Sequence, residues 1–299
     1  MKNIYMKNIP PLLILALGAS ASNAAILAPD DPSISASLGL WLTDAATNFN
    51  GSTWSDSSGN GNDASPVGLV NVGGPVTYSA PAADLLTTSS DHNTSSVAFA
   101  GNADDLLIAN DIFGGTGTDS LTVFVAYHVL SIGGNANLTR PAGFGSVAGT
   151  QANPGDHFNL ASDPSVRKDN GQIGSGTYGG AAPVGSSFIR ISRMDANGVD
   201  EWFNTSAILN SVLTDAGTQY TTSNDDFYLG DLRAGATSTP GFPATSTSDF
   251  AISQVIVFNS ALTDSQISDI NEWMVTSVPE PSSTMLLGIA AFGLIRRRR

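Results

Sequence analysis

This chain of 299 residues has 26 carboxylates, which are the side chains that acid–base catalysis or a calcium site would use. Glycoside hydrolysis needs two carboxyl groups on either side of the scissile bond. Outside the two end segments the only glutamates are Glu201 and Glu272. Asp200 and Glu201 are adjacent, so on a strand their side chains would point to opposite faces. The sequence therefore predicts no catalytic pair of glutamates, although pairs of aspartates leave a polysaccharide-acting enzyme as an alternative.

The sequence also offers little support for a catalytic nucleophile, a histidine metal site or a nucleotide-binding site. The chain has no cysteine, and His92, His128 and His157 are not spaced as metal ligands. No G-x-S-x-G sequence is present to form a nucleophile elbow. Residues 174–179 match G-x-G-x-x-G, but a dinucleotide site needs an apolar strand before that motif and a helix after it, and Pro183 follows closely. We predict no catalytic residues and no nucleotide cofactor.

Calcium is the ion that the aspartates would suit best, because it prefers carboxylate and carbonyl oxygens. Asp104 and Asp105 stand at the start of a predicted strand, and Asp249 stands just before the last strand. We name these three residues as candidate ligands, with turn formation as the alternative for the first two. The run 195–200 imitates part of a calcium loop, but its Asn-Gly step favours a hairpin turn.

The charge is concentrated between the ends. The whole chain has a formal charge of -14, but six of its 12 basic residues and only one of its 26 acidic residues lie in the end segments. The part between them therefore has six basic and 25 acidic residues, a formal charge of -19. Such a field repels nucleic acid and anionic lipid. It favours cations and neutral partners such as sugars.

The N-terminus has the three parts of a secretory signal peptide. Lys2 and Lys7 precede an apolar run at 11–17, and two small-residue sequences that could be cleaved follow at 19–21 and 22–24. The apolar run is too short for a transmembrane helix, which needs about 20 residues. We predict a signal peptide over residues 1–24. An uncleaved membrane anchor and a buried helix are the alternatives.

The C-terminus also has three parts. Val278, Pro279, Glu280 and Pro281 come first, an apolar stretch over residues 285–295 follows, and the chain ends in basic residues. Eleven residues of helix extend about 16 Å, roughly half of a hydrocarbon core. Terminal arginines would stay on the cytoplasmic side. The large apolar side chains are Met285, Leu286, Leu287, Ile289, Phe292, Leu294 and Ile295, and the basic residues are Arg296, Arg297, Arg298 and Arg299.

This order of residues resembles the PEP-CTERM sorting signal. The resemblance covers residues 278–299 and rests on Pro279-Glu280-Pro281, the apolar stretch and the arginines. It implies recognition and removal of the tail by a membrane peptidase of the exosortase type. It also implies a Gram-negative-type envelope, an intermediate held transiently in the inner membrane, and delivery to the cell surface or the extracellular space. A plain tail anchor is the alternative.

The region between the ends has the pattern of an all-β protein. Short apolar runs alternate with Gly, Ser, Thr, Asn and Asp, which is typical of strands joined by turns. One helix is predicted after Thr263, because Gln266 completes a capping box and residues 267, 270 and 274 share one face. The predicted strands are 38–42, 97–99, 106–108, 121–129, 189–193, 201–203, 227–230 and 250–258.

Five segments, in their order, resemble the laminin-G-like domain of the concanavalin A-like class. They are residues 40–45, 54–64, 97–108, 121–129 and 249–273. The resemblance implies an antiparallel jelly-roll β-sandwich over residues 25–277, with one short closing helix, followed by a hydrophobic tail helix. Gln254 and Ala100 stand where the family often has Glu and Asp, which weakens any acidic site taken over from it.

The same resemblance implies carbohydrate binding through aromatic rings. Trp202 and Tyr178 are the candidate glycan residues, whereas Trp41 and Trp54 fit the core pattern of the family. We therefore expect a non-catalytic adhesive or carbohydrate-binding module whose partner is an exopolysaccharide or a cell-surface glycan. The alternatives are a secreted glycoside hydrolase or lyase, and a purely structural coat or biofilm matrix protein.

Overall fold

The computed structural model describes part of the chain. The described residues are 26–66, 68–71, 74–77, 85–87, 95–99, 106–114, 118, 120–131, 142–144, 159–160, 165–168, 171–175, 185, 187–204, 211–216, 226–230 and 249–276. The predicted signal peptide and sorting tail lie outside them, as do Asp104, Asp105 and Tyr178.

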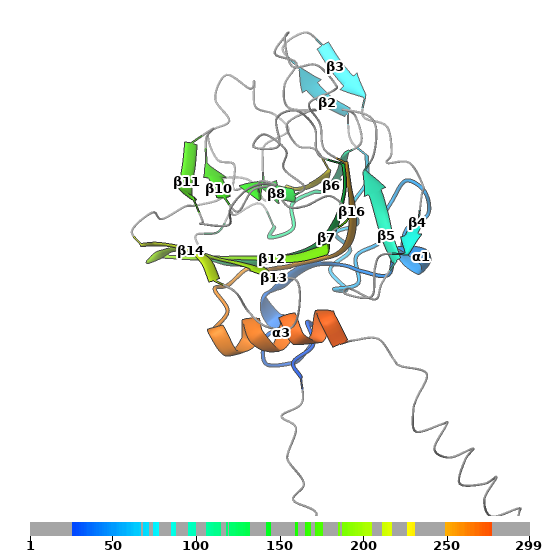
Figure 1. The fold of residues 1–299 in the computed structure, drawn as a ribbon. Coiled ribbons are helices and arrows are strands. Elements are labelled where there is room, and N and C mark those ends of the chain that lie inside the picture. Colours follow the sequence, from blue (N-terminus) through cyan, green and yellow to red (C-terminus); the bar gives the residue numbers. More distant parts are fainter. Residues whose placement is uncertain are drawn as a thin grey trace, which may run out of the picture.

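Two antiparallel sheets form the two main layers of the molecule (Figure 1). The large sheet has eight strands, in the order β14-β13-β12-β7-β16-β5-β4, with β1 also paired to β16. These strands are β1 (Leu38–Leu42), β4 (Leu85–Thr87), β5 (Ser95–Phe99), β7 (Leu121–Ser131), β12 (Ser187–Asp195), β13 (Gly198–Asn204), β14 (Ser211–Ala216) and β16 (Asp249–Phe258).

The small sheet has six strands, in the order β11-β10-β9-β8-β15-β6. They are β6 (Leu106–Ala109), β8 (Ala142–Phe144), β9 (Asn159–Leu160), β10 (Ser165–Lys168), β11 (Gly171–Ser175) and β15 (Phe227–Gly230). A separate hairpin joins β2 (Gly68–Asn71) to β3 (Gly74–Thr77), and the helical segments are η1 (Ser35–Ser37), α1 (Ala45–Asn48) and α3 (Asp264–Thr276). The predicted class, mostly β with antiparallel sheets, is confirmed; the jelly-roll type stays a prediction.

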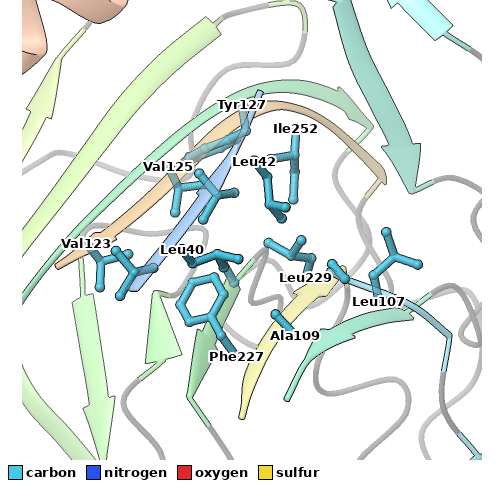
Figure 2. Packing of buried hydrophobic residues seen from close by; sticks show 14 of the residues in the cluster. Leu40, Leu42, Leu107, Ala109, Val123, Val125, Tyr127, Phe227, Leu229 and Ile252 are labelled. Carbon is cyan, nitrogen blue, oxygen red and sulfur yellow. The ribbon is translucent and has the colours of Figure 1, made fainter. Parts of the chain in front are cut away.

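The main core lies between the two sheets (Figure 2). Strand β7 contributes every second residue from Leu121 to Val129, and all five side chains are at most 1% exposed. Figure 2 shows Val123, Val125 and Tyr127 on the same side as Ile252 of β16, with Phe227 of β15 facing them. The predicted apolar face of this strand is confirmed, since side chains of a strand alternate between faces.

Helix α3 covers the opposite face of the large sheet (Figure 1). Its Ile267, Ile270 and Met274 are buried in one apolar cluster with Phe124 and Phe258 of the large sheet. The predicted apolar face of this helix is therefore confirmed. The predicted capping box is also formed, because the backbone N–H of Thr263 donates to Gln266 Oε1 at 2.9 Å and the N–H of Gln266 donates to Thr263 Oγ1 at 3.4 Å. No helix in the described part of the chain is both long and apolar enough to cross a membrane.

A loop from Asp56 to Asp63 fixes strand β1 in place. Asp56 Oδ1 accepts hydrogen bonds from the N–H groups of Trp41 and Ser58, and its Oδ2 accepts from Ser58 Oγ and the N–H of Asn62. The Asn62 amide in turn donates to the carbonyl of Gly39 at 2.8 Å. Gly59 and Gly61 have positive φ, as expected of a structural turn.

Replacing Asp56 with alanine should destabilise the protein by about 2–3 kcal/mol. The variant loses the hydrogen bonds to a charged acceptor, and the backbone N–H groups that donate to the Asp56 carboxylate lose their partner. Equilibrium unfolding in urea measures the change. Asp30→Ala is the matched control, since Asp30 is exposed and surface substitutions change stability by about 0.5 kcal/mol or less. Equal stability of the two variants would contradict this role of Asp56.

Candidate functional site

A charged cluster lies on the inner face of the large sheet, toward the small sheet. Arg190 and Ser192 come from β12, and Glu201 comes from β13, where it is paired with Ser192. Phe188 and Met194, two residues to either side on β12, belong to the core between the sheets. Since alternate residues of a strand share a face, Arg190 and Ser192 point inward as well. All three polar side chains are buried.

The geometry of this cluster neutralises its charges. Arg190 Nη2 donates to Glu201 Oε2 at 2.6 Å, and Ser192 Oγ donates to Glu201 Oε1. Both carboxylate oxygens of Glu201 thus accept a hydrogen bond, which a buried carboxylate requires. Among the side chains described on the inner face of the large sheet, Glu201 is the only carboxylate. The described residues of that face therefore form a structural ion pair, without the second carboxyl group of a glycosidase.

Trp202, the neighbour of Glu201, points to the opposite face. It belongs to the cluster beneath α3 and is 8% exposed. The guanidinium of Arg193 lies over its ring, 5.1 Å from the centroid, a cation–π arrangement. Trp202 therefore packs under a cation in this structure, and its role in glycan binding stays a prediction.

Arg193 links the β12–β13 hairpin to α3. Its guanidinium pairs with Asp200 and with Asp264, each at 2.6 Å, and also donates to the carbonyl of Leu262 at 3.0 Å. Burial lowers the pKa of Arg193, but the hydrogen bonds and charges of Asp200 and Asp264 more than reverse that effect, so the pKa ends above its ordinary value. The start of the helix is thereby held against the outer face of the sheet.

Residues 195–198 form a hairpin turn, as predicted, and Asp200 lies in β13. Asp195 pairs with Gly198 to close the β12–β13 hairpin, and the N–H of Asn197 donates to Asp195 Oδ1 at 2.7 Å. Asp200 is engaged by Arg193, so it is directed away from a calcium loop. The alternative of a partial calcium loop is not needed to explain these residues.

The candidate calcium ligands are not brought together by the described part of the structure. Asp249 begins β16, where its backbone pairs with Ser131 of β7, while Asp104 and Asp105 lie outside the described residues. The described residues contain no group of three or more His, Cys, Asp or Glu side chains that could hold a metal ion. Calcium binding through Asp104, Asp105 and Asp249 stays a prediction.

In the sequence Glu201 stood out only as one of two glutamates between the end segments, with no role assigned, and its partners Arg190 and Ser192 were not predicted. One feature of the sequence could have indicated a buried ion pair. Arg190 is a charged residue in an alternating strand, and Arg190 and Ser192 occupy the core-facing positions between Phe188 and Met194. A charged residue at such a position is almost never buried without a partner. An opposite charge on the neighbouring strand of the same hairpin was therefore the partner to look for.

Residues 277–299 match the PEP-CTERM protein-sorting motif. The chain carries this sorting motif. It implies export, sorting to the cell surface and processing by an exosortase, as the sequence predicted. No curated protein matches the chain, so the match concerns the motif alone.

Solved structures resemble the chain in fold. A GH54 α-L-arabinofuranosidase soaked with a cyclic sulfate inhibitor aligns with a TM-score of 0.52 and 12% identity, over 75% of this chain and 50% of that one. A variant of that enzyme soaked with 4-nitrophenyl α-L-arabinofuranoside gives a TM-score of 0.53 and 13% identity, with the same coverage. A sialidase from Trypanosoma rangeli aligns with a TM-score of 0.43 and 14% identity, over 81% of this chain and 33% of that one. The chain thus spans half the length of the first protein and a third of the sialidase.

The ion pair predicts a non-additive pattern of stability. Glu201→Gln should cost about 3–5 kcal/mol, because it leaves the buried charge of Arg190 without its counter-charge. The double replacement of Arg190 by Met and Glu201 by Leu should recover most of that loss, since it removes both charges at once. Urea unfolding of Arg190→Met, of Glu201→Leu and of the double variant measures the coupling, and Glu201→Gln measures the loss of the charge alone.

Asp264→Asn is the control for this cycle, because the Asp264 side chain is 80% exposed and an exposed ion pair contributes at most about 1 kcal/mol. If the effects of the two single replacements simply added up in the double variant, the buried pair would not be an energetic unit.

Proposed function

We propose that this protein is a non-catalytic surface module that binds neutral glycans of the extracellular matrix or the cell surface, delivered by its PEP-CTERM signal. The observation that carries the proposal is the sorting motif at residues 277–299. The body that it delivers has two main antiparallel sheets, which are compatible with the predicted jelly-roll sandwich. Its formal charge of -19 between the end segments favours neutral sugars over nucleic acid.

The arrangement of the described residues supports a binding role over catalysis. Glu201 is held by Arg190 and Ser192 on the inner face of the large sheet, so its oxygens are occupied by the protein itself. A general acid or nucleophile must instead have a carboxyl oxygen within reach of the glycosidic bond. We therefore assign Glu201 a structural role.

A secreted polysaccharide-acting enzyme is the second candidate. The fold-level likeness to a GH54 α-L-arabinofuranosidase, a variant of which was soaked with 4-nitrophenyl α-L-arabinofuranoside, favours it. Fold alone does not decide between binding and hydrolysis, since the same fold serves many functions. A purely structural coat or matrix protein is the third candidate.

The sorted protein should bind neutral polysaccharides without cleaving them. We expect retention on a glycan array that changes little between low and physiological salt, because neutral sugars provide no ionic contacts. Parallel arrays with calcium and with a chelator test the predicted ion. Reducing-sugar release from host exopolysaccharide should stay at the level of the heat-denatured control.

Each other candidate has its own outcome in this experiment. Sugar release that disappears in a folded Glu201→Gln variant would support hydrolysis and contradict the assigned structural role. No retention on any glycan, with normal delivery to the surface, would support a structural coat protein.

Replacing Pro279, Glu280 and Pro281 together by alanine should abolish removal of the tail. In the native host we expect the variant to stay in the membrane fraction at full mass, while the wild type is found outside the cell at lower mass. Mass spectrometry of the intact protein measures this. Replacing Ser283 and Thr284 by alanine is the neighbouring control, and equal processing of the two variants would contradict recognition through the Pro-Glu-Pro sequence.

A further inference from the structure

Both ends of the described body meet at one face of the molecule. Leu27, close to its N-terminal end, and Val275, next to its C-terminal end, pack against the same apolar cluster beneath α3. Trp41 and Trp273 lie there too, with ring centroids 5.6 Å apart in an edge-on arrangement. Figure 1 shows α3 on the side of the large sheet that faces away from the small sheet. Helix α3, which directly precedes the sorting motif in the sequence, therefore lies on the outer face of the large sheet.

The connection from this face to the apolar stretch of the tail is short. Helix α3 ends at Thr276, and the apolar stretch begins at Met285. Nine steps of fully extended chain reach at most about 30 Å. Pro279 is only three residues beyond the helix, which is about 10 Å. While the tail is in the inner membrane, the end of α3 thus stays within about 30 Å of the bilayer.

We infer that the sorting tail, while it is in the membrane, keeps the body from inverting, so that the end of α3 stays on the membrane side of the body and the small sheet is not turned toward the bilayer. A domain of about 250 residues has a radius of gyration near 18 Å, hence a diameter of about 45 Å. An inverted body would place the end of α3 about 45 Å from the bilayer. That distance exceeds the reach of the connection, so inversion is excluded by length alone.

The charge of α3 keeps the body at a distance from the bilayer. Asp264 and Glu272 are exposed on the helix and Asp269 is partly exposed, and the helix has no basic residue in its last turn. An acidic surface is repelled by anionic lipid headgroups. This repulsion opposes direct contact between α3 and the headgroups, whereas the length of the connection limits how far the end of α3 can move away from them.

The small sheet is consequently the surface that external partners reach first. Stacked sheets lie about 10 Å apart, and a helix is about 10 Å wide, so the small sheet lies about 20 Å farther from the bilayer than α3. This orientation depends on the tail and on the position of α3. It goes beyond the proposed glycan binding and does not rest on it.

Because the chain has no cysteine, single-cysteine variants can be labelled without background. Glu272→Cys places a fluorophore on α3, and Lys168→Cys places one at the end of β10 in the small sheet. The full chain is inserted through its tail into vesicles whose lipids have a nitroxide on the headgroup. We expect quenching at position 272 to be several-fold stronger than at position 168.

Two further variants make the outcome decisive. Ser265→Cys labels the other end of α3, so the test survives if Glu272→Cys folds poorly, and it too should be quenched more than position 168. A Gly/Ser insertion after Thr276 that doubles the connection should remove the difference, because the reach then exceeds the diameter of the body. Equal or reversed quenching in the unmodified connection would overturn the inferred orientation, whatever glycans the protein binds.

Discussion

The large sheet is covered on both faces, and most of the structure follows from that constraint. Strand β16 is buried at every residue from Phe250 to Phe258. Its Val255 and Val257 face the small sheet, and its Ile256 and Phe258 face α3. A strand that is apolar on both faces gains stability only when both are removed from water. The small sheet buries one face of the large sheet and α3 buries the other. Loss of either layer would therefore expose the central strands to water.

The sequence predicted the local features of this arrangement. Alternation in residues 121–129 predicted the inner face of β7, and the apolar run at 250–258 predicted a central strand, because both signals lie within one element. The cap of α3 was predictable since Thr263 and Gln266 are three residues apart. The pairing of strands was not, because β1 and β16 are separated by about 200 residues, and contacts between such distant segments leave no periodic signal in a single sequence.

At the candidate site too, residue types could be read from the sequence, but the contacts between strands could not. Glu201 was identifiable as a scarce carboxylate, but its environment depends on which residues stand opposite it in the β12–β13 register. With Ser192 opposite and Arg190 on the same face, the carboxylate becomes part of an internal ion pair. The sequence likewise suggested that a sugar ring could stack on Trp202. Because side chains alternate along β13, however, this ring lies under Arg193 in the cluster beneath α3. Residue type indicated possible chemistry, and strand register determined its use.

The boundary between body and sorting tail also has a packing origin. Met274 is 1% exposed in the cluster beneath α3, and Val275 is the last residue with a described side chain that packs against that cluster. The sorting motif begins at residue 277, directly after this contribution to the core ends. A cut beyond this point removes no buried side chain from the described body, whereas unwinding the last turn of α3 would expose apolar surface at a cost of about 25 cal/mol per Å². The helix can therefore close the fold and serve as the attachment point of the sorting tail, because the described residues of its buried face precede residue 277.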